Sequence, residues 1–140
     1  MFKKTVKYVN FNGVEKEKDL YFNLTETEIN KFEMSYPGGL YGILDTIIKE
    51  KDNVKIIEMF DIVVKKAYGV KSPDGERFEK GEEIYKAFEE SAAYDEFFKW
   101  LVVDNNAAIF FNSMIPEKLA EEVKKQEQLK AETTELPSNT

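Results

Sequence analysis

Residues 55–103 read KIIEMFDIVVKKAYGVKSPDGERFEKGEEIYKAFEESAAYDEFFKWLVV and hold the densest apolar periodicity of the chain. Apolar side chains recur first at three- and four-residue steps, the pattern of one face of an amphipathic helix. They are Ile56, Ile57, Phe60, Val63, Val64, Ala67 and Tyr68. Gly69 is expected to end this helix. Ser72-Pro73-Asp74-Gly75 is typical of a tight turn, because Pro fixes φ and Gly tolerates positive φ.

Two further apolar stripes follow that turn, and each has helical spacing. The first begins with Ile84, Tyr85 and Phe88, and the second contains Tyr94, Phe97, Phe98, Leu101 and Val102. The pattern predicts a helical core built from aromatic-rich faces. The residues that we expect to be mostly buried are Phe60, Val64, Phe88, Phe97, Phe98 and Leu101. This pattern indicates packing and not chemistry.

The composition indicates a single globular domain with a well-solvated surface. The 140 residues are 42% apolar and 34% charged, and the formal net charge is −7, which is typical of a chain that can bury a real core. The acidic balance disfavours a nucleic-acid partner. No apolar run is long enough for a membrane span, and the N-terminus lacks the features of a signal peptide. We therefore expect a cytoplasmic protein with no membrane partner.

The residue types exclude several kinds of catalytic site. The chain has no Cys and no His, so it has no disulfide, no Ser-His-Asp triad and no His-based zinc site. Most acidic residues lie beside lysines at helical spacing, as Asp61 does with Lys65, which is typical of a solvated helix surface. Asp74-Gly75-Glu76 lacks the repeated ligands of a calcium loop. We expect no catalytic residue, no cofactor and no metal site.

Residues 2–24 are predicted to form a β-hairpin. Asn12-Gly13 favours a two-residue type I′ turn, because both central positions of that turn need positive φ. Val6 and Tyr8 are expected on one face of the first strand, and Val9 and Phe11 on the other. The second strand has a fully charged middle over residues 15–19, which we expect to be exposed and to discourage edge-to-edge pairing.

Helix signals continue from residue 25 to residue 116. Thr25 and Glu28 form a predicted capping box, and Pro37-Gly38-Gly39 should end the helix that follows. A further apolar stripe runs over residues 40–48, Asn53 can cap the next helix, and Asp104-Asn105-Asn106 should separate the last two helices. From residue 117 the chain has little apolar surface.

The resulting prediction is an α+β fold, mostly α, in one globular domain over residues 1–116. The hairpin of residues 2–24 packs on a bundle of about five or six helices formed by residues 25–116. Residues 117–140 are predicted to be a charged tail, partly helical to disordered.

Three blocks of the sequence resemble a known protein family in their order and spacing. They read YVNFNGVEKEKDLYFNLTETEI, KIIEMFDIVVKKAYGVKSPDGERF and AYDEFFKWLVVDNNAAIFFNSMIP. Their marks include Phe22-Asn23-Leu24-Thr25, Ala67-Tyr68-Gly69 and Ala93-Tyr94. The resemblance spans residues 2–116 and is to the tail assembly chaperones of long-tailed bacteriophages of Gram-positive hosts. Pro37-Gly38 and Lys99-Trp100 depart from the residues expected there.

The resemblance implies a non-enzymatic role in the cytoplasm of the infected bacterium. Such chaperones bind the long tape measure protein, keep it soluble and help tail-tube subunits to polymerise around it. They are absent from the mature virion. Three further partners stay open for this chain: the tail-tube protein, a frameshifted longer form of the chain, and other copies of the chain itself.

Two hypotheses from other classes also stay open. One is a regulatory or inhibitory module that binds a different protein. The other is a carboxylate enzyme, which requires a pocket with two convergent acids of shifted pKa.

If the chain is a chaperone, its partner surface should contain exposed aromatic side chains, because amphipathic aromatics are common interface anchors. Tyr36, Tyr41 and Phe78 flank predicted loops, and Trp100 lies next to the last stripe, so these four are the candidate protein-binding residues. The competing interpretation is that they cover the ends of the core.

Overall fold

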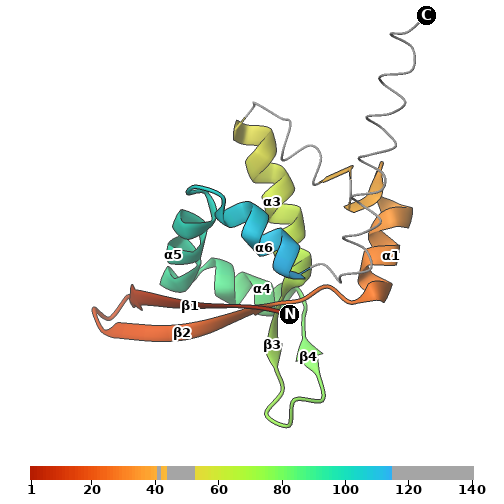
Figure 1. Ribbon diagram of the computed structural model, residues 1–140. Helices are drawn as coiled ribbons and strands as arrows, with labels where there is room; N and C mark the ends of the chain where they lie inside the picture. Colours follow the sequence, from red (N-terminus) through yellow and green to blue (C-terminus); the bar gives the residue numbers. More distant parts are fainter. Residues whose placement is uncertain (41, 44–52, 115–140) are drawn as a thin grey trace, which may run out of the picture.

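The computed structural model describes residues 1–40, 42–43 and 53–114 (Figure 1). In chain order its elements are β1 (Phe2–Val9), β2 (Glu15–Phe22), α1 (Glu26–Ser35), α3 (Asn53–Ala67), β3 (Tyr68–Lys71), β4 (Phe78–Glu79), α4 (Glu82–Glu89), α5 (Ala92–Leu101) and α6 (Asn106–Met114). The predicted α+β class with mostly helix is confirmed for this part of the chain. Within it, no helix has the length and apolar character needed to cross a membrane.

The strands form one four-stranded antiparallel sheet in the order β1-β2-β3-β4. β1 and β2 pair along their whole lengths, from Phe2 opposite Phe22 to Val9 opposite Glu15. β2 joins β3 through two residue pairs only, both at the end of β2. The sheet therefore consists of two hairpins that share a short junction and extend in different directions (Figure 1).

The second hairpin was not predicted from the sequence, although its turn was. α3 ends at Ala67, close to the predicted end, but Gly69 does not cap it, because this glycine lies in β3 opposite Tyr21 and has no positive φ. Gly75 has a φ of 75° in the predicted turn. The Ser72 hydroxyl accepts a hydrogen bond from the Arg77 backbone N–H at 2.9 Å and donates one to Asp74. The strands on either side have four and two residues, which is too short for a clear alternation of apolar and polar side chains.

The predicted type I′ turn at Asn12-Gly13 is wrong. Of the residues in this turn only Gly13 has a positive φ, at 75°. The backbone N–H of Asn10 donates to the Val14 carbonyl at 2.9 Å, which leaves a three-residue loop. The side chain of Asn10 accepts hydrogen bonds from the N–H groups of Asn12 and Val14 at 2.9 and 3.0 Å. Asn10 therefore favours a longer loop with a single positive-φ glycine.

The core lies between the sheet and the helices. α4, α5 and α6 gather over one face of the β1–β2 hairpin (Figure 1), and α3 adds Phe60, Val63, Val64 and Ala67. Phe22 of β2 is completely buried at its centre. Its ring stacks on Phe97 of α5, with ring centroids 4.6 Å apart, and meets Phe110 of α6 edge to face at 5.1 Å. Offset and edge-to-face aromatic contacts of this kind stabilise a fold beyond the area that they bury.

Five of the six predicted core residues are buried, namely Phe60, Val64, Phe88, Phe97 and Leu101. Phe98 is half-buried instead, and its ring stacks on Tyr94 near the surface. Successive residues of an α-helix point about 100° apart. On α5 it is Phe97 that points at Phe22 and Phe110 of the core, and Phe98 lies to the side of that face.

Several local predictions are confirmed. The charged residues 15–19 are exposed. Val6 and Val9 lie on opposite faces of β1, as predicted, and the structure shows that the Val6 face is the buried one while Val9 and Phe11 are exposed. α1 ends at Ser35, just before Pro37, and a break separates α5 from α6. In the apolar stripe predicted over residues 40–48, Leu40 and Ile43 are buried. Residues 44–48 and the predicted tail of residues 117–140 lie outside the described residues.

We predict that Phe97→Ala lowers the free energy of unfolding by about 3–5 kcal/mol, because it removes a fully buried ring from a close-packed aromatic cluster. Phe98→Ala is the matched control, since it deletes the same ring one position along the same helix. We expect it to cost less than about 2 kcal/mol. Urea denaturation measures both. Equal losses for the two variants would contradict the assignment of the core face of α5.

Candidate protein-interaction surface

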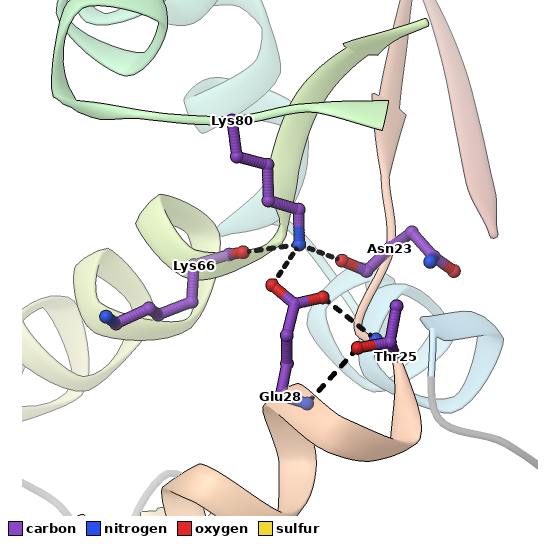
Figure 2. A network of polar contacts seen from close by, with 5 residues as sticks. All are labelled: Asn23, Thr25, Glu28, Lys66 and Lys80. Carbon is purple, nitrogen blue, oxygen red and sulfur yellow. Dashed lines mark hydrogen bonds and ion pairs between the residues drawn. The ribbon is translucent and has the colours of Figure 1, made fainter. Parts of the chain in front are cut away.

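Helix α1 is attached to the rest of the fold through the side chain of Lys80, which lies between β4 and α4 (Figure 2). Its ammonium group donates hydrogen bonds to the Asn23 carbonyl at 2.6 Å, to Glu28 Oε2 at 2.7 Å and to the Lys66 carbonyl at 2.8 Å. These acceptors belong to the β2–α1 connection, to α1 and to the last turn of α3. One cation therefore connects four separate parts of the chain.

Glu28 links this cation to the start of α1. Its other carboxylate oxygen accepts a hydrogen bond from the Thr25 N–H at 3.0 Å, and its own N–H donates to Thr25 Oγ1 at 3.1 Å, which confirms the predicted capping box. Burial opposes ionisation of Glu28, but the hydrogen bonds from Lys80 and Thr25 outweigh it and lower the pKa. The carboxylate therefore stabilises the fold above the usual Glu pKa, and this contribution is lost as the pH falls through the lowered value.

A cavity of about 310 Å³ lies between α1 and α3, and we call it the α1–α3 cavity. Phe32, Tyr36 and Ile62 form its apolar part. Lys31 and Lys66 are on its rim, and neither ammonium group has an ion-pair partner in the part of the chain that the structure describes. Because Glu28, which also lines the cavity, is paired with Lys80, the rim is basic in a chain whose net charge is −7.

The β1–β2 hairpin ends in an exposed apolar group of three residues, which we call the hairpin tip. The exposed fractions are 55% for Val9, 85% for Phe11 and 46% for Val14. The hydrogen bonds of Asn10 hold the loop that carries them. The strand pattern placed Phe11 on the face opposite Val6, but it did not say which face is exposed and did not mark this residue as a site. An aromatic side chain in a turn that faces away from the core was the available signal.

A third apolar group lies where α5 turns into α6, and we call it the α5–α6 corner. Val102, Val103 and Ile109 are all exposed there. The Asn106 side chain donates a hydrogen bond to the Trp100 carbonyl at 2.7 Å and holds the corner together.

Tyr36 and Trp100, two of the candidate aromatic residues, lie at these surfaces. Tyr36 is half-buried, follows the end of α1 and lines the α1–α3 cavity. Trp100 is also half-buried and stacks on Phe2 with ring centroids 5.8 Å apart, while the Lys4 ammonium lies 4.7 Å from its ring. Trp100 therefore packs the hairpin against α5 beside the α5–α6 corner.

The other two candidates have different outcomes. Phe78 is half-buried in β4, and a Cβ atom on Gly69 would lie 2.6 Å from its ring. The ring thus fills the space that the glycine leaves and packs the second hairpin. Tyr41 lies outside the described residues. Tyr36, Phe78 and Trp100, the three described candidates, lie at three different places in the fold.

The carboxylate-enzyme hypothesis required two convergent acids of shifted pKa. Among the described carboxyl groups, Asp61 of α3 is the one whose pKa is raised. Burial is the main cause, the hydrogen bond from the Tyr94 hydroxyl opposes it, and the charge of Glu89 adds to it. In the same part of the chain, no three acidic residues converge as a set of metal ligands.

We predict that Asp61→Asn raises the free energy of unfolding at pH 7 by at most about 0.5 kcal/mol, since water still screens this carboxylate. A raised pKa in the folded state means that protonation stabilises the fold at low pH and that this gain is lost as the pH rises. The gain of the variant should therefore shrink at pH 4. Melting curves at both pH values measure it, with the exposed Glu58→Gln as control. A larger gain at pH 4 than at pH 7 would refute this assignment.

A comparison with known families gives a match along the whole chain. The family model described as phage tail assembly chaperone matches residues 1–140. No curated protein and no solved structure matches the chain. The family match includes the hairpin tip, the α1–α3 cavity and the α5–α6 corner, and it agrees with the resemblance found in the sequence. The chain belongs to the phage tail assembly chaperone family.

Proposed function

We propose that this protein binds the tape measure protein of a long-tailed phage, keeps it soluble and assists assembly of the tail tube. It does so without catalysis, in the cytoplasm of the infected bacterium, and it does not stay in the mature virion. The observation that carries this proposal is the family match over residues 1–140.

The exposed apolar groups support a protein-binding role. A chaperone that keeps a long partner soluble needs apolar surface of its own, because the hydrophobic effect drives such contacts. The α5–α6 corner offers three exposed aliphatic side chains on a helical scaffold beside Trp100. An amphipathic helix of the tape measure protein could lay its apolar face on this corner, which is a common mode of recognition. Trp100 would then border the contact as an aromatic anchor.

The experiment is co-expression of this chain with the tape measure protein encoded by the same phage. The wild type should raise the soluble yield of the tape measure protein and co-elute with it in gel filtration. Ile109→Lys places a charge on the corner at an exposed position, so its fold should be unchanged by circular dichroism. We expect it to weaken the complex by roughly 5–30-fold, the effect of 1–2 kcal/mol.

Met34→Lys is the matched control, because Met34 is 84% exposed on α1 and lines neither of the other two surfaces. It should leave the complex unchanged. If the wild type neither raises the soluble yield nor co-elutes, the tape measure assignment is wrong. Capture of a different target would instead favour the regulatory-module hypothesis. If the wild type binds and Ile109→Lys binds equally well, the role stands and the corner is not the surface.

A further inference from the structure

We propose that the α1–α3 cavity is a second recognition site, which takes a large apolar side chain that lies beside a carboxylate group in a protein partner. The partner that we assign is a segment of the tape measure protein with this chemistry, so the inference deepens the proposed function and rests on it. None of the cavity residues belongs to the α5–α6 corner, and the two sites therefore bind independently.

The cavity is formed before any partner binds. Its volume of about 310 Å³ exceeds the roughly 150 Å³ of an apolar cavity that holds benzene, so a phenyl or leucyl side chain fits. Phe32, Tyr36 and Ile62 supply apolar and aromatic contacts for such a side chain. Lys80 holds α1 against the last turn of α3 through Glu28. Binding therefore requires little rearrangement of the fold, which lowers its entropic cost.

The rim of the cavity carries two positive charges that the described part of the chain does not neutralise. Lys31 and Lys66 have no ion-pair partner among these residues. Glu28 stands three positions before Lys31, which is the spacing of a helical ion pair, but its carboxylate lies 2.7 Å from Lys80 instead. The Lys66 side chain extends away from Glu28 (Figure 2), and the residues three and four positions before it in α3 are apolar. Both ammonium groups can therefore bind an anion from outside the chain.

The wall of the cavity also contributes a hydrogen-bond donor. Tyr36 is half-buried there, and its hydroxyl group has no hydrogen-bond partner among the residues that the structure describes. Carboxylates bind most strongly where donors and cations act together. A carboxylate next to the bound side chain would meet this hydroxyl group at the wall and the two lysines at the rim.

Charge complementarity selects the partner segment. The chain has a net charge of −7, so most of its surface repels acidic groups. The rim of the cavity is an exception, and a segment with Asp or Glu next to a large apolar residue gains both contacts there. A segment with Lys or Arg in the same place meets two like charges, which is unfavourable. The cavity therefore discriminates by charge among the apolar segments of a long partner, whereas the aliphatic side chains of the α5–α6 corner carry no charge.

Amide NMR of the ¹⁵N-labelled wild type, titrated with N-acetyl-L-phenylalanine, tests the cavity without any tape measure protein. This probe carries a phenyl ring beside a carboxylate, and N-acetyl-L-phenylalaninamide carries the same ring without the charge. Both should shift the amides of Lys31, Phe32 and Lys66. The carboxylate probe should bind roughly threefold to tenfold more tightly, because it meets two exposed cations. Salt at about 0.5 M should reduce this preference, because it screens exposed charges.

Three variants assign the effect to the cavity. Lys31→Gln combined with Lys66→Gln should remove the preference for the carboxylate and leave the affinity for the neutral probe unchanged. Lys65→Gln is the matched control, because Lys65 is an exposed lysine beside Lys66 that does not line the cavity. Ser35→Trp fills the cavity from an exposed position at the end of α1 and should abolish binding of both probes. Circular dichroism checks that each variant is folded.

Short overlapping peptides that cover the tape measure protein of the same phage identify the segment. The peptides that shift the cavity amides should contain a large apolar residue next to Asp or Glu, and N-acetyl-L-phenylalanine should compete with them. Ser35→Trp should weaken the complex with the whole tape measure protein at least about tenfold, because it blocks a buried anchor.

Three results would overturn the proposal. The first is the absence of shifts in the cavity amides at a probe concentration of about 10 mM, well above the roughly millimolar affinity expected for a ligand of this size. The second is a neutral probe that binds as tightly as the carboxylate, or an unchanged preference in the double lysine variant. The third is a shift of the cavity amides with protein concentration alone, since a second copy would then occupy the cavity.

Failure of this inference is distinguishable from failure of the proposed function. A tape measure complex that forms equally well with Ser35→Trp keeps the proposed function and removes the cavity from it. If the probes bind as expected and no tape measure complex forms with the wild type, the tape measure assignment is wrong. The partner named here then fails with it, and the preference of the cavity for a carboxylate beside an apolar group stands.

Discussion

The position of α1 depends on one partly buried cation. Lys80 satisfies three hydrogen-bond acceptors, among them the Lys66 carbonyl near the end of α3, where a helix leaves carbonyl groups without partners. The three hydrogen bonds, one of them to the charged Glu28 carboxylate, offset the cost of removing the ammonium group from water. The network orients α1 against the α3 end, while Ile29 and Phe32 pack its inner face. The shape of the α1–α3 cavity follows from that orientation.

Structural features that depend only on residues close together in the chain were predicted from the sequence. The capping box at Thr25 and Glu28, the helix end before Gly69 and the inward face of α5 each depend on residues within a few positions of one another. All three are found in the structure, except that Phe98 does not belong to the inward face of α5. The type I′ turn failed because the Asn10 side chain competes for the backbone N–H groups of the loop. The preference of type I′ turns for Asn-Gly takes no account of a neighbouring side chain that accepts hydrogen bonds from the loop N–H groups.

Contacts between distant parts of the sequence could not be predicted in this way. Lys80 binds Asn23 and Glu28 across 57 and 52 positions, and no spacing rule links them. The cavity that includes Tyr36 is formed by two helices that are separate in the chain, so only the tyrosine itself was proposed. The residues of β3 and β4 carry little strand pattern of their own. The two strands pair where the ring of Phe78 packs into the space that Gly69 leaves without a side chain.

The three apolar surfaces lie on different parts of the fold and depend on different interactions. The hairpin tip and the α5–α6 corner project from the aromatic core, whereas the α1–α3 cavity depends on the polar network of Lys80 (Figure 2). A change at Lys80 should therefore affect the cavity and leave the aromatic core in place. The sequence thus produces the cavity and the two exposed apolar groups by separate interactions.

Amide hydrogen exchange of Lys80→Met, compared with the wild type and with Lys86→Met as a control at an exposed lysine of α4, tests this claim most directly. Local opening raises exchange in the affected element before the rest of the fold opens. We predict faster exchange in α1, including the N–H groups of Glu28 and Ile29, with unchanged protection in β1, β2 and α5. Unchanged protection in α1, or an equal loss of protection throughout the protein, would contradict the account.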